Sequence, residues 1–268
     1  MLLEIKNLTI DFETGETPVR AVHDVSLAID AGEVVGLVGE SGSGKTTLGL
    51  AVTRLVPEPP AVVRGGQILL EGKDLLRVPQ NELYRIRGGT ISYVFQEPST
   101  SLNPVMTVGA QLLETIALHT PQRGAAAAAR AIELLKLVSI PAPQERLRSY
   151  PHELSGGMKQ RVMIAMAIAS GPKLLIADEP TTALDVTLER QIVALLQRLQ
   201  RELHLSILVI SHSIHLVKRL ANRIAVMQGG RLVEVGPVSQ VLARPQHDYT
   251  RHLLAAQPKV AALEGISG

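Results

Sequence analysis

The phosphate-loop pattern G-x-x-x-x-G-K-[ST] is matched at every fixed position by Gly39-Glu40-Ser41-Gly42-Ser43-Gly44-Lys45-Thr46. Glycines in such a loop let successive backbone N–H groups approach phosphate oxygens, because no side chain blocks the way. The lysine ammonium can then neutralise the β- and γ-phosphates. The motif predicts a site for a nucleoside triphosphate, and the alternative is a chance glycine-rich turn.

The residues on either side supply the context that this motif requires. Residues 33–38 are predicted to form a buried strand entering the loop, and residues 46–51 a helix leaving it. The N-terminus of that helix adds a favourable dipole for phosphates. A strand, a loop and a helix in this order favour a phosphate site over a chance turn.

Composition narrows the class of protein. The 268 residues are 46% hydrophobic and 19% charged, enough for one large domain or a core with a subdomain. The absence of cysteine excludes disulfides, thiolate zinc sites and cysteine-ligated iron–sulfur clusters. The net charge is +2 and the basic residues are scattered along the chain, which does not favour a nucleic-acid partner. Aromatic residues make up only 2%, which also does not favour base stacking on a nucleic acid.

The chain opens Met1-Leu2-Leu3-Glu4, without the basic and then apolar pattern of a signal peptide. The longest apolar stretch, residues 162–169, is too short to span a bilayer. We therefore expect a cytoplasmic protein, or one held to a membrane only by partners.

The apolar patterns predict an α/β protein with a helical insert. Residues 3–29 alternate as two antiparallel strands broken at residues 13–18, and residues 66–72 read as a third strand. From residue 79 to about 149 the pattern is typical of helices, most clearly at residues 125–138.

After Lys173 the chain returns to alternating strands and helices. Residues 174–177 and 206–210 are predicted to be buried parallel strands. The first of these runs into two carboxylates, Asp178 and Glu179, which a nucleotide hydrolase needs for Mg²⁺ and for the attacking water. Solvated acids often end strands, so this prediction depends on the phosphate loop that precedes it.

A second glycine motif, Leu154-Ser155-Gly156-Gly157-Met158-Lys159-Gln160, precedes the apolar residues 162–169. A hydroxyl and glycine N–H groups at a helix N-terminus can bind phosphate. The alternative is a serine that only caps the helix.

Taken in order, these motifs resemble the ABC-transporter ATPase family. The resemblance includes Gln96 in Val94-Phe95-Gln96-Glu97-Pro98, Ala183-Leu184-Asp185 as the D-loop, and His212 as the switch histidine. It covers essentially the whole chain. It implies a P-loop NTPase fold with a RecA-like core, an antiparallel β subdomain and an inserted α-helical subdomain.

The resemblance also implies how one domain, residues 1–268, is divided. Residues 1–78 and 173–240 would form mainly the core and the antiparallel β subdomain. Residues 79–172 would form mainly the helical subdomain, and residues 241–268 a C-terminal tail.

The family further implies a head-to-tail dimer that encloses ATP and Mg²⁺ between the phosphate loop of one subunit and the signature of the other. Catalytic roles would fall to Glu179, His212 and Gln96, and metal contacts to Thr46, Gln96 and Asp178. The residues implied to contact nucleotide are Phe12, Gly39, Glu40, Ser41, Gly42, Ser43, Gly44, Lys45, Thr46, Thr47, Ser155, Gly156, Gly157 and Asp185.

Three of these residues have a plainer interpretation. Phe12 would stack on adenine, but it is also an ordinary edge-strand core residue. Taken alone, Gln96 is a surface glutamine and His212 a strand-end histidine satisfied by backbone.

Two further stretches, residues 97–104 and residues 244–254, resemble the peptide/nickel importer branch. Asp248 departs from the proline usual there, and Ser213 from the usual aspartate of S-H-D. The cysteine-free chain cannot build the iron–sulfur extension of many peptide members.

The resemblance implies an ATPase subunit of an importer at the cytoplasmic face of the cell membrane, driving uptake of peptides, nickel or a related small solute. Its partners would be a second ATPase subunit, identical or paralogous, two integral membrane permeases and an extracytoplasmic solute-binding protein, without nucleic acid. One alternative is a non-transport ABC ATPase that serves a soluble enzyme complex. Another is a regulatory subunit that binds ATP without hydrolysing it. The presence of Glu179, Gln96 and His212 argues against this alternative.

Overall fold

The computed structural model describes residues 1–182 and 184–256. The strands are β1 (Leu3–Phe12), β2 (Val19–Ile29), β3 (Val34–Val38), β4 (Ala61–Leu70), β5 (Lys73–Asp74), β6 (Ile91–Val94), β7 (Leu174–Asp178), β8 (Ser206–Ser211), β9 (Arg223–Gln228) and β10 (Arg231–Pro237). The helices are α1 (Lys45–Val52), α2 (Gln80–Ile86), α3 (Pro98–Ser101), α4 (Val108–His119), α5 (Gly124–Leu137), α6 (Pro143–Arg146), the 3-10 turn Pro151–Glu153, α7 (Gly156–Ile168), α8 (Val186–Leu203), α9 (Ile214–Leu220), α10 (Val238–Ala243) and α11 (Asp248–Ala255).

The centre of the molecule is a six-stranded sheet in the order β10-β9-β3-β8-β7-β6. Strands β9, β3, β8, β7 and β6 are parallel, and β10 runs antiparallel to β9. Every residue of β3, β7 and β8 is buried, as expected for strands covered on both faces. Successive side chains alternate between two apolar clusters: Val34 and Val38 join one, and Val35 and Leu37 the other.

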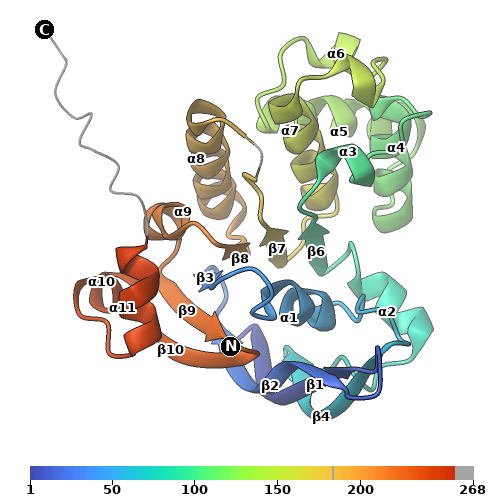
Figure 1. Cartoon of the computed structure of the whole chain (residues 1–268). Coiled ribbons are helices and arrows are strands. Elements are labelled where there is room, and N and C mark those ends of the chain that lie inside the picture. The colour runs from blue at the N-terminus through green and yellow to red at the C-terminus, as the bar shows by residue number, and fades with distance from the viewer. Residues whose placement is uncertain (183, 257–268) are drawn as a thin grey trace, which may run out of the picture.

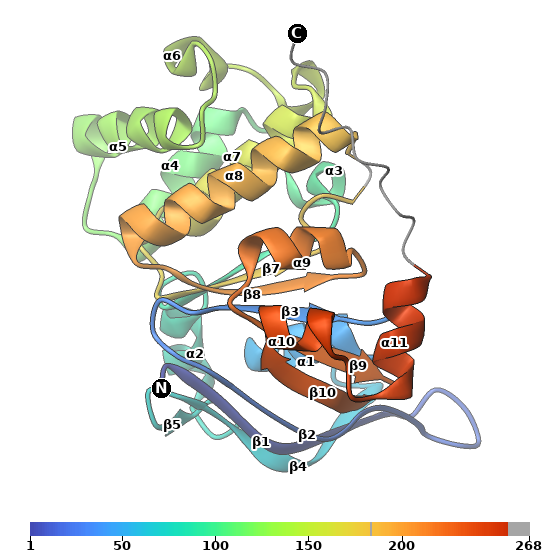
Figure 2. The ribbon, with the colours of Figure 1, turned by 90° about the vertical axis from the view of Figure 1, so that its left-hand side faces the viewer.

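Three layers follow from this alternation (Figure 2). Helices α8 and α9 cover one face of the central sheet. The other face packs on α1 and on a four-stranded antiparallel sheet in the order β2-β1-β4-β5. The two antiparallel strands predicted within residues 3–29 are confirmed as β1 and β2, and the third strand, β4, begins five residues earlier than predicted, at Ala61.

Helices α4, α5 and α7 form a group of their own, at the upper right of Figure 1. Their buried residues recur at helical spacing, as in Val108, Leu112 and Ile116 of α4. The helix predicted at residues 125–138 is confirmed one residue earlier, as α5.

The helical interpretation of residues 79–149 is wrong for Ile91–Val94. These residues form β6, which pairs in parallel with β7 at the edge of the central sheet. Periodicity cannot separate a four-residue apolar strand from a piece of buried helix, because a strand covered on both faces does not alternate. The error matters for the site, since β6 leads directly to Gln96.

Within the described residues, no helix is both long enough and apolar enough to cross a membrane.

Candidate nucleotide site

The predicted site residues meet at one edge of the central sheet. Because β3, β6, β7 and β8 are parallel, their carboxyl ends lie at the same edge, where α/β proteins bind ligands. A cavity of about 680 Å³ opens there, lined by Ala21, Gly39, Glu40, Ser41, Gly42, Gly44, Lys45, Thr46, Thr47, Gln96, Glu179, His212 and Leu253. That volume is in the range of small-molecule sites.

Two glycines of the loop are required by close backbone approach. A Cβ atom on Gly39 would lie 2.2 Å from the carbonyl oxygen of Met227. A Cβ on Gly44 would lie 2.2 Å from the carbonyl oxygen of Ala21, and Gly44 also has a φ of +101°, in the left-handed region. The loop can therefore wrap tightly only with glycine at these positions.

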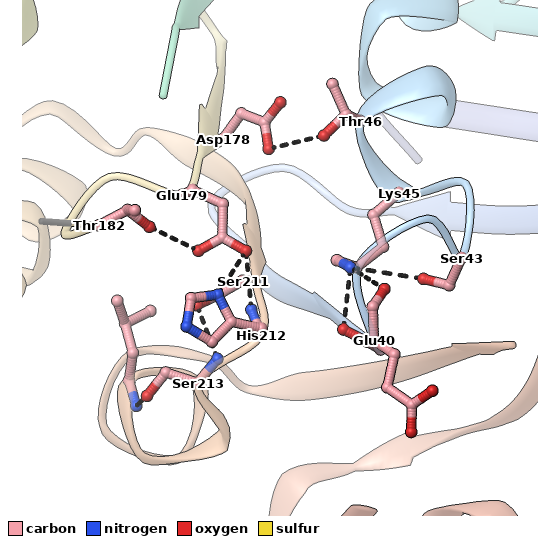
Figure 3. Close-up of polar contacts among 12 residues, drawn as sticks. Glu40, Ser43, Lys45, Thr46, Asp178, Glu179, Thr182, Ser211, His212 and Ser213 are labelled. Atoms are coloured by element: carbon pink, nitrogen blue, oxygen red, sulfur yellow. Dashed lines mark hydrogen bonds and ion pairs between the residues drawn. The ribbon is translucent and has the colours of Figure 1, made fainter. Parts of the chain in front are cut away.

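The loop surrounds the Lys45 ammonium (Figure 3). Its Nζ donates hydrogen bonds to the carbonyl oxygens of Gly39, at 2.9 Å, and Glu40, at 2.7 Å, and contacts Ser43 Oγ at 3.4 Å. Burial lowers the pKa of Lys45, while the nearby carboxylates of Glu179 and Asp178 act in the opposite direction. A phosphate chain on the loop would meet this cation directly.

Asp178 ends β7 and is 2% exposed. Its Oδ1 accepts a hydrogen bond from Thr46 Oγ1 at 3.3 Å, and its Oδ2 accepts one from the Tyr93 hydroxyl at 2.8 Å. Burial raises the pKa of Asp178, and these two hydrogen bonds oppose the rise. Sequence reasoning missed Tyr93, because it did not identify β6; the signal was the short apolar run at Ile91–Val94 after Gly88-Gly89.

Glu179 follows Asp178 with a φ of +47°, which is rare for a residue other than glycine and typical of functional sites. Its Oε1 accepts a hydrogen bond from the backbone N–H of His212 at 2.9 Å and lies 2.9 Å from His212 Nδ1. Its Oε2 accepts a hydrogen bond from Thr182 Oγ1 at 2.9 Å. Figure 3 shows this carboxylate held between His212 and Thr182, facing the side on which Lys45 lies.

Ser213, which stands where the family pattern has aspartate, caps the helix that follows His212. It is the N-cap of α9, and its Oγ accepts a hydrogen bond from the Leu216 N–H at 3.3 Å. Its own N–H donates to Ser211 Oγ at 3.0 Å. Serine therefore caps the helix after His212, at the position where the family pattern has aspartate.

The signature lies outside the cavity. Ser155 is the N-cap of α7 and accepts a hydrogen bond from Met158 N–H at 3.3 Å. Gly156 is exposed, whereas Gly157 is buried and a Cβ there would lie 3.0 Å from Leu188 Cδ2. The capping alternative for Ser155 is thus observed, and contact of the signature with nucleotide stays a prediction.

The D-loop assignment is described in part. Asp185 is the N-cap of α8 and accepts a hydrogen bond from Leu188 N–H at 2.9 Å. Ala183 lies outside the described residues. Asp185 is not among the residues that line the cavity, so its nucleotide contact also stays a prediction.

Phe12 does not line the cavity either. It is half-buried at the end of β1 and packs against the apolar cluster of the antiparallel sheet, so its stacking on adenine stays a prediction. Sequence reasoning missed two lining residues, Ala21 of β2 and Leu253 of α11. Neither belongs to the motifs of the phosphate site, and only the fold brings them to it.

Comparison with known proteins gives consistent matches. Residues 22–182 match a family model described as "ABC transporter". The chain is 49% identical to the oligopeptide transport ATP-binding protein OppD of Bacillus subtilis, over 96% of the chain and 72% of that protein. It is 51% identical to the peptidoglycan transport ATP-binding protein YejF of Agrobacterium fabrum, over 96% of the chain, and spans about half of that longer relative, 47%.

Among solved structures, the ATP-binding cassette MJ0796, a dimer in a post-hydrolysis state bound to ADP and Pi, superimposes with a TM-score of 0.79. The two chains are 28% identical, and the match covers 88% of this chain and 99% of that one. The predicted fold class is thereby confirmed.

Proposed function

Because the chain belongs to the ABC transporter family, we propose that it is the ATP-hydrolysing subunit of a transporter that imports peptides. The observation that carries the ATPase part is the meeting of the phosphate loop, Gln96, Glu179 and His212 on one cavity. The names of the relatives, oligopeptide and peptidoglycan transport proteins, support a peptide-containing solute.

In the proposed reaction, water attacks the γ-phosphorus of ATP and the bond to the β,γ-bridging oxygen breaks, giving ADP and phosphate. The loop N–H groups and the Lys45 ammonium would hold the phosphates and stabilise the charge that develops on them. Glu179 would orient the attacking water, and His212 and Thr182 would fix the direction of its carboxylate. Gln96, which lines the same cavity, would contact that water and the metal.

The residues present fit a magnesium ion. Thr46 Oγ1 and Asp178 Oδ1 lie 3.3 Å apart at the rim of the loop, and both are hard oxygen ligands. Protein sites for Mg²⁺ usually supply one or two carboxylates and leave the other positions to water and substrate phosphates. When bound, Mg²⁺ would neutralise charge on the β- and γ-phosphates.

The proposed partners follow from the signature and from the family. Ser155 and Gly157 lie outside the cavity of their own chain, which supports a head-to-tail dimer in which they reach the γ-phosphate held by a second ATPase subunit. The match to a dimeric cassette supports the same arrangement. We further propose two membrane permeases and an extracytoplasmic solute-binding protein as partners, with the chain at the cytoplasmic face.

The enzymatic part is tested with Glu179→Gln. The amide cannot polarise water as the carboxylate does, so we expect ATP binding to be retained and turnover to fall by roughly 100-fold or more. Nucleotide binding is measured by calorimetry and turnover by phosphate release. Glu114→Gln, at an exposed position of α4, is the matched control. Unimpaired turnover by Glu179→Gln would contradict the role of this carboxylate.

The transport part is tested in cells whose only copy carries one of the two variants. We expect uptake of a labelled oligopeptide to be lost with Glu179→Gln and kept with Glu114→Gln. If both variants keep peptide uptake while Glu179→Gln alone loses nickel uptake, the transported solute is the metal. If neither uptake responds although hydrolysis is lost, an importer function is wrong.

A further inference from the structure

The segment that marks the importer branch, residues 244–254, packs against the phosphate loop. It contains α11, which stands next to β9 in both views of the ribbon (Figures 1 and 2). Nothing in the proposed chemistry uses this helix. One of its side chains nevertheless hydrogen-bonds the backbone of the phosphate loop, and another lines the nucleotide cavity.

The first is Tyr249, whose hydroxyl accepts a hydrogen bond from the backbone N–H of Glu40 at 3.0 Å. Glu40 is the second residue of the loop, 209 positions earlier in the chain. The Tyr249 side chain is packed in the larger apolar cluster and is 8% exposed. Because the ring of Tyr249 is buried, its hydroxyl can fix the position of the Glu40 N–H.

The peptide group that Tyr249 binds also holds Lys45. The N–H of Glu40 and the carbonyl of Gly39 belong to one planar unit and point in opposite directions. On one side this unit donates to Tyr249, and on the other it accepts from Lys45 Nζ at 2.9 Å. One rigid group therefore connects the phenol of α11 to the cation of the phosphate site.

The second side chain is Leu253, one helical turn after Tyr249 and therefore on the same face of α11. Leu253 is 8% exposed and lines the cavity. Tyr249 and Leu253 thus place one face of the helix against the loop and the space beside it.

The rest of the segment holds α11 in position. Glu234 of β10 accepts hydrogen bonds from the backbone N–H groups of Gln246, at 2.9 Å, and His247, at 3.1 Å. His247 caps the helix, since its Nδ1 accepts a hydrogen bond from Tyr249 N–H at 3.1 Å. In the branch motif, His247 therefore caps the start of α11, and Tyr249 contacts the phosphate loop.

We propose that Tyr249 is a positioning residue of the nucleotide site: its hydroxyl orients the Gly39–Glu40 peptide and, through it, the Lys45 ammonium. The proposal rests on the proposed function, because it requires that the cavity binds ATP. It gives the C-terminal segment a role in substrate binding in addition to its role in packing.

The test is Tyr249→Phe, which removes the hydroxyl and keeps the ring. With its acceptor lost, the Glu40 N–H no longer has this partner, and the Gly39–Glu40 peptide is free to shift. We expect affinity for ATP and ADP, measured by calorimetry, to fall by about tenfold. The KM for ATP should rise accordingly, while kcat at saturating ATP stays close to that of the wild type. The matched control is Tyr84→Phe, which removes a hydroxyl from a tyrosine that is 61% exposed.

A second measurement does not depend on nucleotide. Hydrogen exchange of the Glu40 amide should be faster in Tyr249→Phe than in the wild type, while the amides of β3 keep their protection. A merely structural tyrosine would instead lower the Tm of Tyr249→Phe and leave both nucleotide affinity and Glu40 exchange unchanged, which would overturn the proposal. If wild type and Tyr84→Phe failed to bind ATP, the proposed function itself would be wrong and the inference would fall with it.

Discussion

At the scale of single residues, the site buries two ionisable groups of opposite charge. Lys45 is 6% and Asp178 is 2% exposed, and burial shifts both pKa values toward the neutral form. Such groups are costly to bury and are typical of functional sites. Tyr93 reduces the cost at Asp178 by donating a hydrogen bond to its carboxylate, and burial beside that carboxylate raises the pKa of Tyr93.

The cost of burying Asp178 can be measured with Asp178→Asn. The folded-state pKa of Asp178 is raised, so its stabilising contribution is complete below the ordinary pKa of 3.8 and is lost as the pH rises through the raised value. At pH 7 we expect the nucleotide-free variant to have a higher Tm than the wild type. The difference should shrink as the pH falls through the raised pKa. Calorimetry in EDTA checks this, and a Tm difference that does not depend on pH would contradict it.

At the scale of elements, side-chain caps begin the helices that follow the site motifs. Ser213, Asp185 and Ser155 cap α9, α8 and α7, each by accepting a hydrogen bond from the N–H three residues later. These caps satisfy N–H groups that the helix itself leaves unpaired. They also fix where the chain turns after the strand end or loop that bears the functional residue.

The cap of α9 predicts the effect of changes at Ser213. Ser213→Ala should destabilise the protein by about 1 kcal/mol, because the Leu216 N–H loses its acceptor. Ser213→Asp should restore the stability, since a carboxylate caps the helix and favours its dipole. Urea unfolding of both variants checks this, with Ser239→Ala, at an exposed position of α10 without a cap bond, as the control. Equal midpoints for Ser213→Ala and Ser239→Ala would disprove the cap's contribution.

At the scale of the whole molecule, the cavity is built from residues of one chain that lie far apart in sequence, while the signature faces elsewhere. Gly39 and Leu253 line one space, yet Ser155 does not belong to it. A chain whose predicted signature contacts lie outside its own cavity fits a composite site between two subunits.

Mixing two inactive variants tests the composite site. In a head-to-tail dimer of Lys45→Ala with Ser155→Ala, one site carries both changes and the other carries neither. If one intact site suffices for turnover, an equal mixture should regain roughly a quarter of wild-type activity, because half of the dimers are mixed. Phosphate release is compared with that of each variant alone. Activity equal to the mean of the separate variants would show that each chain works by itself.

The sequence alone determined the class of protein and predicted the chemistry of its site. The glycine loop, the two carboxylates at the end of β7 and the capped signature are local patterns. Local patterns specify loops, strands and caps because their physical causes are local: left-handed φ values, hydrogen-bond acceptors and alternating burial. The strand–loop–helix around Lys45 and most element positions could therefore be predicted. The family matches confirm the fold, and the contact residues of the nucleotide stay predictions.

Only the tertiary structure decided which distant residues join the site. Tyr93 reaches Asp178 because β6 pairs beside β7, and a four-residue buried strand has no period that sequence analysis could detect. Tyr249 reaches Glu40 because β10 returns the chain antiparallel beside β9 and holds the start of α11. Such contacts depend on strand order and helix docking, which are set by packing of the whole core. They therefore produce no motif of fixed spacing that could be recognised in the sequence.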